Sequence, residues 1–79
     1  MYHLYIRQTC PFSKRVSSFM KKNKMKVQIH DVDVKPNEKE LIKRGGKKQT
    51  PYLVDTKTQK EMYESSDIIG YLETRIAED

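Results

Sequence analysis

The sequence is poor in cysteine, and this scarcity limits where the protein can work. Cys10 is the one cysteine among 79 residues, so the chain cannot form an internal disulfide. Small secreted domains usually need several disulfides, and a lone thiol therefore favours a reducing compartment, which we take to be the cytoplasm. The first residues form no apolar leader, and no apolar run approaches the roughly 20 residues of a membrane-spanning helix. We therefore expect neither a secretory signal nor a membrane anchor.

Apolar residues are also scarce, at 35% of the chain, which predicts a thin core built on well-defined faces. A chain of this length is expected to form one domain, residues 1–79, that buries only about 60% of its unfolded surface. The formal net charge is +5, but the lysines are spread along the sequence without interleaved aromatic residues. We therefore expect a solvated basic surface that binds neither nucleic acid nor membranes. The alternative is a positive field that attracts a small anionic ligand.

Hydrophobic periodicity predicts seven secondary-structure elements. Pro11 suits the first position of a helix, and Gly45 with Gly46 suits a helix end. Asn37 and Ser65 suit the capping position at helix starts. The helix faces expected in the core contain Phe12, Val16, Phe19 and Met20 in the first helix, and Ile68, Ile69, Leu72 and Ile76 in the last. The predicted order is strand 2–6, helix 11–22, strand 27–30 continued by 32–34, a short helix opened by residues 36–37 and stopped by residues 45–46, strand 52–54, strand 59–63 and a helix from residue 65.

This order, β-α-β-α-β-β-α, restricts the topology. A right-handed crossover through the first helix makes the first two strands parallel. The short turn at residues 55–58 makes the last two strands antiparallel. The sequence therefore predicts an α/β fold in which a four-stranded mixed sheet is flanked by helices on both faces.

The chemistry of the chain centres on Cys10, which stands between the first strand and the first helix. Unpaired N–H groups and the helix dipole favour an anion at a helix start. The nearby side chains of Arg7, Lys14 and Arg15 add positive charge. An ordinary thiol is only about 3% ionised at pH 7, whereas activated cysteines at such positions have pKa values of roughly 3.5–7.5. We therefore predict a reactive thiolate in place of an inert core cysteine.

Two other kinds of cysteine site are disfavoured by the sequence. Neither His3 nor His30 stands in a zinc-ligand pattern with Cys10, so we predict no metal site and treat both histidines as ordinary strand or surface residues. A cysteine protease would need a substrate cleft that nothing else in so short a chain supplies.

Three segments resemble the glutaredoxin family, and they occur in the family's order over almost the whole chain. Residues 9–13 (TCPFS) resemble the C-P-Y-C active-site loop with its second cysteine replaced by Ser13. Residues 49–51 (QTP) resemble the segment that carries a cis proline. Residues 63–68 (YESSDI) resemble the glutathione-binding segment that opens the last helix. This last segment is especially similar to the E-S-x-x-I form found in the N-terminal domains of glutathione transferases.

The resemblance implies a thioredoxin-like (glutaredoxin) fold, with Cys10 as the nucleophile and glutathione as the co-substrate. It implies that the Thr50–Pro51 bond is cis and that the Thr50 backbone pairs with the cysteinyl part of glutathione. The remaining residues implied in the site are Ser66 and Asp67 at the γ-glutamyl end, Arg7 and Gln49 at the glycyl carboxylate, Phe12 beside the ligand or in the helix core, and Thr9, Pro11 and Ser13 in the active-site loop. For Ser66 and Asp67 the alternative is simple helix capping.

Ser13 sets the expected reaction cycle. A dithiol glutaredoxin uses its second cysteine to resolve a mixed disulfide with a protein, and serine cannot do so. The resemblance therefore implies a monothiol enzyme that reduces glutathionylated proteins or low-molecular-weight disulfides, with a second glutathione as the reductant. We expect it to be a monomer.

Two rival functions remain open. Monothiol glutaredoxins with a C-G-F-S loop, similar to this chain at Phe12 and Ser13, hold a 2Fe-2S cluster between two protomers. Pro11 replaces their glycine, and the short spacing from Arg7 to Cys10 lacks their insertion; both departures favour the redox enzyme. The second rival is a thioredoxin-like binding module without catalytic activity, because a fold alone does not establish function.

Overall fold

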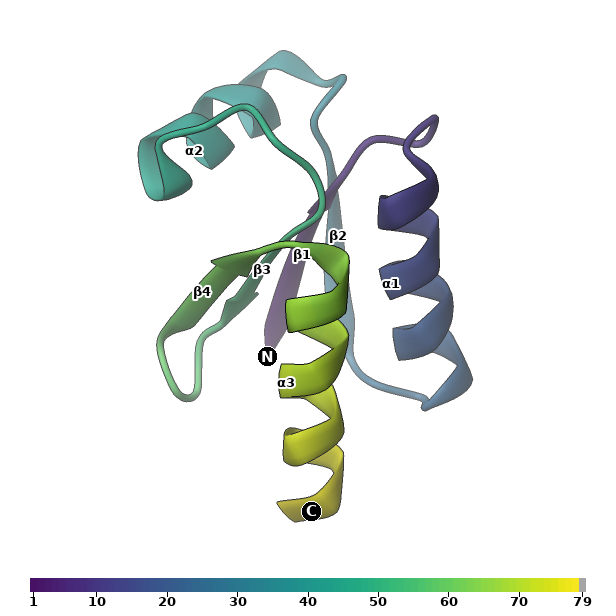
Figure 1. Ribbon diagram of the computed structural model, residues 1–79. Helices are drawn as coiled ribbons and strands as arrows, with labels where there is room; N and C mark the ends of the chain where they lie inside the picture. Colours follow the sequence, from purple (N-terminus) through teal and green to yellow (C-terminus); the bar gives the residue numbers. More distant parts are fainter. Residues whose placement is uncertain (79) are drawn as a thin grey trace.

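The computed structural model describes residues 1–78, with side chains as far as residue 77, and contains the predicted elements in the predicted order (Figure 1). They are β1 (Tyr2–Ile6), α1 (Pro11–Lys22), β2 (Val27–Asp31), α2 (Lys35–Gly45), β3 (Tyr52–Asp55), β4 (Lys60–Tyr63) and α3 (Ser65–Glu78). Within the described residues, no helix is both long enough and apolar enough to cross a bilayer.

The four strands form one mixed sheet in the order β2-β1-β3-β4. β1 and β2 are parallel, whereas β3 is antiparallel to both β1 and β4, so both predictions of strand direction are confirmed. α1 and α3 lie on one face of the sheet and α2 lies on the other (Figure 1). The predicted α/β architecture, with helices on both faces, is therefore the one observed.

Alternation along the strands divides the core into two layers, because neighbouring strand residues point to opposite faces. In β1, Leu4 packs with residues of α1 and α3, whereas Tyr5 packs with Leu41 of α2. All four residues of the central strand β3 are buried, as expected for a strand covered on both faces. The layer under α1 and α3 contains Leu4, Val16, Met20, Leu53, Ile68 and Leu72. The layer under α2 contains Tyr5, Val32, Leu41, Tyr52 and Val54.

The second strand ends earlier, and the second helix begins earlier, than the sequence predicts. The Asp31 carboxylate accepts the N–H of Asp33 at 2.9 Å, and the Asp31 carbonyl accepts the N–H of Val34 at 3.1 Å. These bonds turn the chain, so the prediction that the strand continues through Val34 is wrong. α2 then begins at Lys35 with Val34 in the cap position. Asn37 is therefore not the cap; its side-chain amide donates to the Asp31 carbonyl at 2.9 Å.

Smaller corrections concern the last hairpin and the last helix. β4 begins at Lys60, one residue later than predicted. α3 already includes Ser65, and the cap position falls to Glu64, whose carbonyl accepts the N–H of Ile68 at 2.9 Å. Ile76 is 37% exposed and so does not complete the buried stripe. The last turns of α3 extend beyond the strands, where there is no sheet to cover them (Figure 1).

The topology brings three connecting segments to one end of the sheet. Tyr5 of β1, Tyr52 of β3 and Tyr63 of β4 are register partners on adjacent strands. The carboxyl ends of β1 and β4 therefore lie beside the amino end of β3. The loop after β1, the loop before β3 and the start of α3 meet at this end (Figure 1).

Candidate functional site

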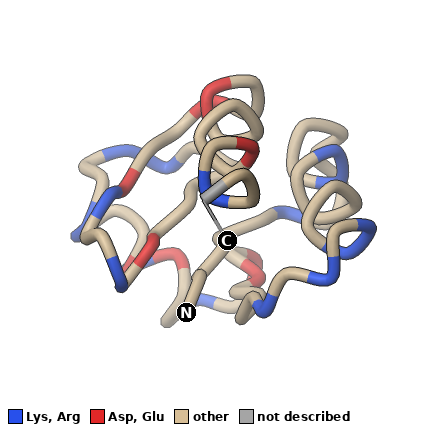
Figure 2. Tube along the Cα trace, turned by 90° about the horizontal axis from the view of Figure 1, so that it is seen from below, with Lys and Arg blue, Asp and Glu red and all other residues tan. Residues whose placement is uncertain are grey.

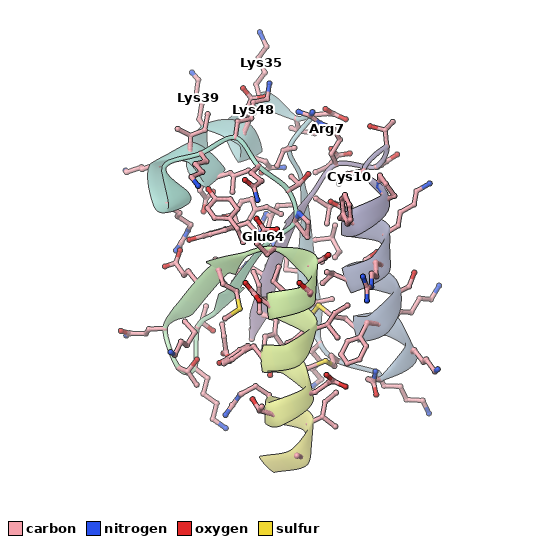
Figure 3. All side chains as sticks on the ribbon, in the orientation of Figure 1. Arg7, Cys10, Lys35, Lys39, Lys48 and Glu64 are labelled. Atoms are coloured by element: carbon pink, nitrogen blue, oxygen red, sulfur yellow. The ribbon has the colours of Figure 1, made fainter. Side chains whose placement is uncertain are left out.

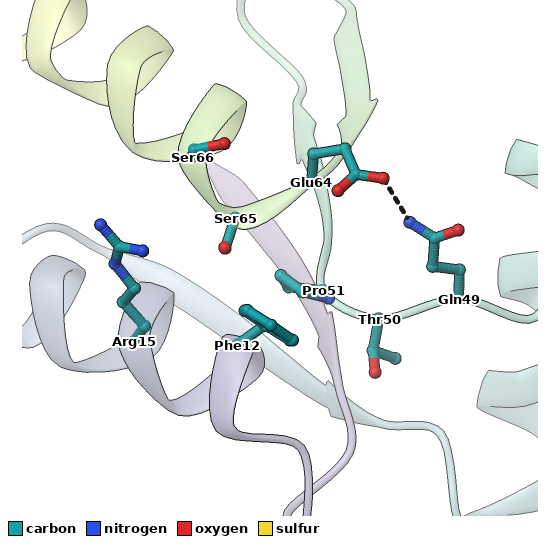
Figure 4. Close-up of a pocket in the computed structure, with 8 residues that line it drawn as sticks. All are labelled: Phe12, Arg15, Gln49, Thr50, Pro51, Glu64, Ser65 and Ser66. Carbon is teal, nitrogen blue, oxygen red and sulfur yellow. Dashed lines mark hydrogen bonds between the residues drawn. The ribbon is translucent and has the colours of Figure 1, made fainter.

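A pocket of about 400 Å³ lies where these three segments meet (Figure 4). Its volume falls within the range of small-ligand sites in proteins, about 300–1,000 Å³. It is lined by Phe12 and Arg15 from α1, by Gln49, Thr50 and Pro51 from the loop before β3, and by Glu64, Ser65 and Ser66 at the start of α3.

Cys10 stands beside this pocket in the cap position of α1, with extended backbone and Pro11 as the first helical residue. Its N–H donates to the Arg7 carbonyl at 2.9 Å, and its carbonyl accepts the N–H of Lys14 at 3.1 Å. The side chain is half-buried. Its Sγ lies 3.8 Å from the carbonyl oxygen of Thr50, a residue of the pocket wall. The predicted nucleophile is thus held between a helix start and the candidate ligand site.

The environment of Cys10 lowers the pKa of its thiol. Burial by itself raises this pKa, but the Ser13 hydroxyl and N–H, the Thr50 hydroxyl and the Phe12 N–H all hydrogen-bond the sulfur, and the net direction is downward. These donors stabilise the thiolate over the thiol. The direction agrees with the sequence-based expectation, and the two N–H groups are those of the helix start. Arg7 is not among the groups responsible.

Ser13 has a structural part in the site. It is 1% exposed, and its Oγ accepts the N–H of Arg7 at 3.3 Å. The residue that replaces a second cysteine therefore joins the end of β1 to α1 while its hydroxyl also stabilises the Cys10 sulfur.

The loop before β3 presents Thr50 to Cys10 and is fixed by several contacts. The Thr50–Pro51 peptide bond is cis, as the resemblance implied. Upstream, the Tyr63 hydroxyl accepts the N–H of Lys47 at 3.2 Å and donates to the Lys47 carbonyl at 2.8 Å. Gly46, with φ 83°, ends α2 in the left-handed conformation that glycine favours. The position of Thr50 thus follows from contacts on both sides of it.

Gln49 and Glu64 connect the loop before β3 to the start of α3. The Gln49 side-chain amide donates to a Glu64 carboxylate oxygen at 2.9 Å (Figure 4). Glu64 has a φ of 69°, which is uncommon for a residue with a side chain. Such conformations cluster at binding sites, where the surrounding fold maintains them.

Two of the predicted glutathione-binding residues stand apart from the pocket wall. Arg7 Nε lies 3.3 Å from an Asp33 carboxylate oxygen, so its guanidinium is engaged at the surface beyond the pocket. Asp67 lies exposed in the first turn of α3. By contrast, the structure brings Phe12 and Ser66 together at the pocket, with Phe12 59% exposed and outside the core.

Three pocket residues were not among those the sequence singled out for binding: Arg15, Glu64 and Ser65. Arg15 follows Phe12 by three positions, and this spacing places both residues on one face of a helix. Arg15 makes no ion pair with any described residue. The helical spacing is a signal that could have identified it.

The described part of the chain contains no group of three His, Cys, Asp or Glu side chains placed to hold a metal ion. His3 and His30 lie on the neighbouring strands β1 and β2, where His3 Nδ1 and His30 Nε2 are 2.9 Å apart. The His30 ring also stacks on Tyr5, with ring centroids 4.7 Å apart. Both histidines belong to the face of the sheet that α2 partly covers.

Comparison with known protein families matches residues 4–79 to the model described as "Glutathione S-transferase, N-terminal domain". The chain belongs to this family. The match covers nearly the whole sequence and includes all three segments that meet at the pocket. It supports the transferase-type domain that the segment at residues 63–68 resembles, and it does not specifically support the monothiol glutaredoxins. No curated protein gave a significant match.

The fold of this transferase-type domain is also found among solved structures. Human glutathione-S-transferase T1-1 in its apo form superposes with a TM-score of 0.83 over 98% of this chain, at 24% sequence identity. At this identity the likeness shows the thioredoxin-like fold alone. The chain spans about a third of that structure, since the match covers 33% of the human chain.

Proposed function

We propose that this protein is a glutathione-dependent thiol–disulfide oxidoreductase of the monothiol type, with Cys10 as its nucleophile. The observation that carries the proposal is the half-buried Cys10 thiol at the start of α1, 3.8 Å from the Thr50 carbonyl and beside an open pocket. Its lowered pKa increases the fraction of the thiol that is ionised, and the thiolate is the species that attacks disulfides. Membership of a glutathione transferase domain family supports glutathione as the ligand.

The pocket offers complementary groups to both ends of glutathione. At the start of α3 the backbone N–H groups favour a carboxylate, and the Glu64 side chain offers a partner for the γ-glutamyl ammonium. Thr50 offers its backbone to the cysteinyl unit, in the manner of a short added strand. At the glycyl carboxylate, Arg15 joins Arg7 as a candidate because it lines the pocket and makes no ion pair with the described residues.

The cycle has two exchange steps. The Cys10 thiolate attacks the glutathione sulfur of a mixed disulfide, forming a Cys10–glutathione disulfide and releasing the substrate thiolate, which takes a proton from water. The thiolate of a second glutathione then attacks the glutathione sulfur on Cys10. Glutathione disulfide leaves and the Cys10 thiolate is restored. In sum, one mixed disulfide and one glutathione give one thiol and one glutathione disulfide. The sulfur of the second glutathione is oxidised as the substrate sulfur is reduced, and the first glutathione sulfur stays in a disulfide throughout.

A reaction at the Cys10 sulfur is favoured over activation of glutathione by the Ser13 hydroxyl. A transferase that conjugates glutathione to an electrophile needs a donor facing the bound glutathione thiol. Ser13 is buried and already bonded to the Arg7 N–H and the Cys10 sulfur. Cys10 is the half-buried group on the pocket side, and a thiolate there forms a disulfide with glutathione.

A coupled assay tests the proposal. The purified protein is given a glutathionylated peptide, glutathione and glutathione reductase, and NADPH consumption is followed. We expect turnover that depends on glutathione and is lost in Cys10→Ser, with mass spectrometry showing one glutathione on Cys10 after substrate is added without reductant. Ser18→Ala, an exposed serine on the same helix, is the matched control and should keep full activity.

Two outcomes would contradict the proposal. One is undiminished turnover in Cys10→Ser. The other is conjugation of glutathione to 1-chloro-2,4-dinitrobenzene without any disulfide reduction, which would indicate a transferase. The colour of the concentrated protein tests the rival cluster carrier, since a brown dimer with about one 2Fe-2S cluster per two chains would favour that function.

A further inference from the structure

Most of the excess positive charge of the chain lies in one segment beside the Cys10 pocket. Residues 35–48 form α2 and the start of the following loop, and they contain six basic and two acidic side chains. This segment therefore carries +4 of the formal net charge of +5. It leads directly to Thr50, whose carbonyl oxygen lies 3.8 Å from the Cys10 sulfur. The charge is thus concentrated next to the reactive thiol.

A lysine stripe, consisting of Lys35, Lys39 and Lys43, runs along α2. The three residues are spaced four apart and so share one helix face. All three are exposed, and none makes an ion pair with a described residue. Figure 3 shows Lys35 and Lys39 projecting at the same end of the molecule as Cys10. A surface hollow of about 550 Å³ adjoins the stripe and is lined by Lys39, Glu40, Lys43 and Arg44.

The first part of the stripe does not stabilise the helix that carries it, whereas Lys43 lies in the last turn of α2, where a cation is favourable. Like charges four residues apart repel each other, and Lys35 is the first residue of α2, at the positive end of the helix dipole, where cations are unfavourable. Lys48 differs, because its ammonium lies 3.2 Å from a Glu38 carboxylate oxygen. The charge of the stripe is therefore available to a partner instead of being used within the fold.

We propose that the lysine stripe docks acidic segments of glutathionylated proteins and so brings their mixed disulfides to Cys10. The inference rests on the proposed function, because it names the substrate class of the same thiol. A protein disulfide can reach the half-buried Cys10 sulfur only by bringing its own surface against this end of the molecule. Complementary charge there raises the rate of productive encounter. A nucleic acid is less favoured, since residues 35–48 contain no aromatic side chain on which a base could stack.

Docking can be measured without any reaction. The isotope-labelled protein is titrated with an acidic decapeptide that contains four glutamates and a serine in place of the cysteine, and amide shifts are followed by NMR. We expect shifts within residues 35–48 that disappear when the glutamates are replaced by glutamine or when salt is raised. Equally large shifts of the amides of lysines at the opposite end of the molecule, away from Cys10, would overturn the proposal. Stronger shifts of the same amides with a single-stranded RNA of equal charge would also overturn it.

The kinetic test uses the same peptides with a glutathionylated cysteine. At low salt we expect the acidic peptide to be reduced about tenfold faster than the glutamine peptide, a modest steering effect. The triple variant Lys35→Glu, Lys39→Glu, Lys43→Glu should bring this ratio to about one or below. A ratio that stays unchanged in the variant would overturn the proposal.

The matched control reverses three exposed lysines near the other end of the sheet, as Lys22→Glu, Lys26→Glu and Lys60→Glu, with the same change in net charge. Figure 2, which views the molecule from that end, shows Lys and Arg on α1 and the segment after it. The control should keep the tenfold ratio; equal loss in both variants would indicate bulk charge and contradict docking at α2. If neither peptide is reduced, the proposed function is refuted. The docking proposal is still decided by the NMR titration, which requires no reaction.

Discussion

Gln49 donates a hydrogen bond to Glu64 at 2.9 Å, and the bond joins the loop before β3 to the start of α3 at the candidate glutathione pocket. Glu64 is held with a φ of 69°, a conformation that costs a residue with a side chain roughly 1–2 kcal/mol relative to a relaxed one. The fold maintains this conformation and thereby places a carboxylate on the pocket wall. We therefore expect Glu64 to favour ligand binding at a cost to the stability of the fold.

Replacing Glu64 by glycine should separate the two effects. We expect Glu64→Gly to raise the free energy of unfolding by about 0.5 kcal/mol, because relief of the positive φ exceeds the entropic cost of glycine together with the loss of the exposed hydrogen bond from Gln49. The same change should weaken glutathione binding about tenfold, equivalent to about 1.4 kcal/mol. Urea unfolding and calorimetric titration with glutathione measure the two quantities.

Gln59→Gly is the matched control, since Gln59 has a φ of 62° in the exposed turn between β3 and β4. It should give a similar gain in stability with unchanged glutathione affinity. Equal glutathione affinities of the two variants would show that the Glu64 side chain does not bind glutathione.

Ser13→Ala should raise the pKa of Cys10. The Ser13 hydroxyl is one of the hydrogen bonds that lower this pKa, and without it a higher pH is needed to form the thiolate. Activity should therefore fall more at pH 6 than at pH 8, and the thiolate absorbance near 240 nm should titrate at higher pH. Losing the bond from the Arg7 N–H should also cost about 1 kcal/mol of stability. An unchanged absorbance titration would show that the hydroxyl does not stabilise the thiolate.

Arg15 and Arg7 should differ in their effect on glutathione binding. Arg15→Ala removes a cation from the pocket wall and should weaken binding by about 1.5 kcal/mol, the usual value for a hydrogen bond to a charged group. Arg7→Ala should cost less affinity, because the Arg7 guanidinium is engaged by Asp33. Calorimetric titration of both variants gives the comparison. A larger loss of glutathione affinity in Arg7→Ala than in Arg15→Ala would indicate that Arg7, and not Arg15, binds the glycyl carboxylate.

Much of the fold could be predicted because local patterns and tertiary packing agree. The short β-prone run that contains Leu4 and Tyr5 forms the predicted strand, and both residues are buried in separate layers. The predicted end of the second strand was wrong because a side chain there accepts a hydrogen bond from the backbone two residues later. The Asp31 carboxylate accepts the N–H of Asp33 where β2 ends, although the β-branched apolar residues at 32 and 34 are typical of a strand.

The candidate site could be predicted in its segments but less well in its individual side chains. The position of Cys10 before a helix could be read from the sequence. The cis peptide bond before Pro51 was implied by the family resemblance and is confirmed, although a Thr-Pro pair by itself favours trans. Which charged side chains reach the pocket depends on partners distant in sequence. Asp33 engages Arg7, and that contact follows from where β2 ends, which the sequence pattern did not reveal.

Asp55 should make the stability of the fold depend on pH. Its side chain is 2% exposed. Burial raises the pKa of Asp55. Hydrogen bonds from the Tyr71 hydroxyl, the Lys57 N–H and the Thr58 hydroxyl, together with the charge of Arg75, lower this pKa by more, so the net direction is downward. A carboxyl whose folded pKa is lowered stabilises the fold above its unfolded pKa of about 4. This contribution is lost as the pH falls through the folded value.

Asp55→Asn should therefore lower the free energy of unfolding by about 3 kcal/mol at pH 7, because it removes one partner of a largely buried pair. The difference from the unmodified protein should shrink as the pH falls from about 5 to 2, where the Asp55 carboxyl is itself protonated. Asp33→Asn, which breaks the exposed pair with Arg7, is the control and should cost less than about 1 kcal/mol. Urea unfolding across this pH range measures both differences. A deficit for Asp55→Asn that stayed constant down to pH 2 would show that the ionised carboxylate is not what stabilises this end of β3.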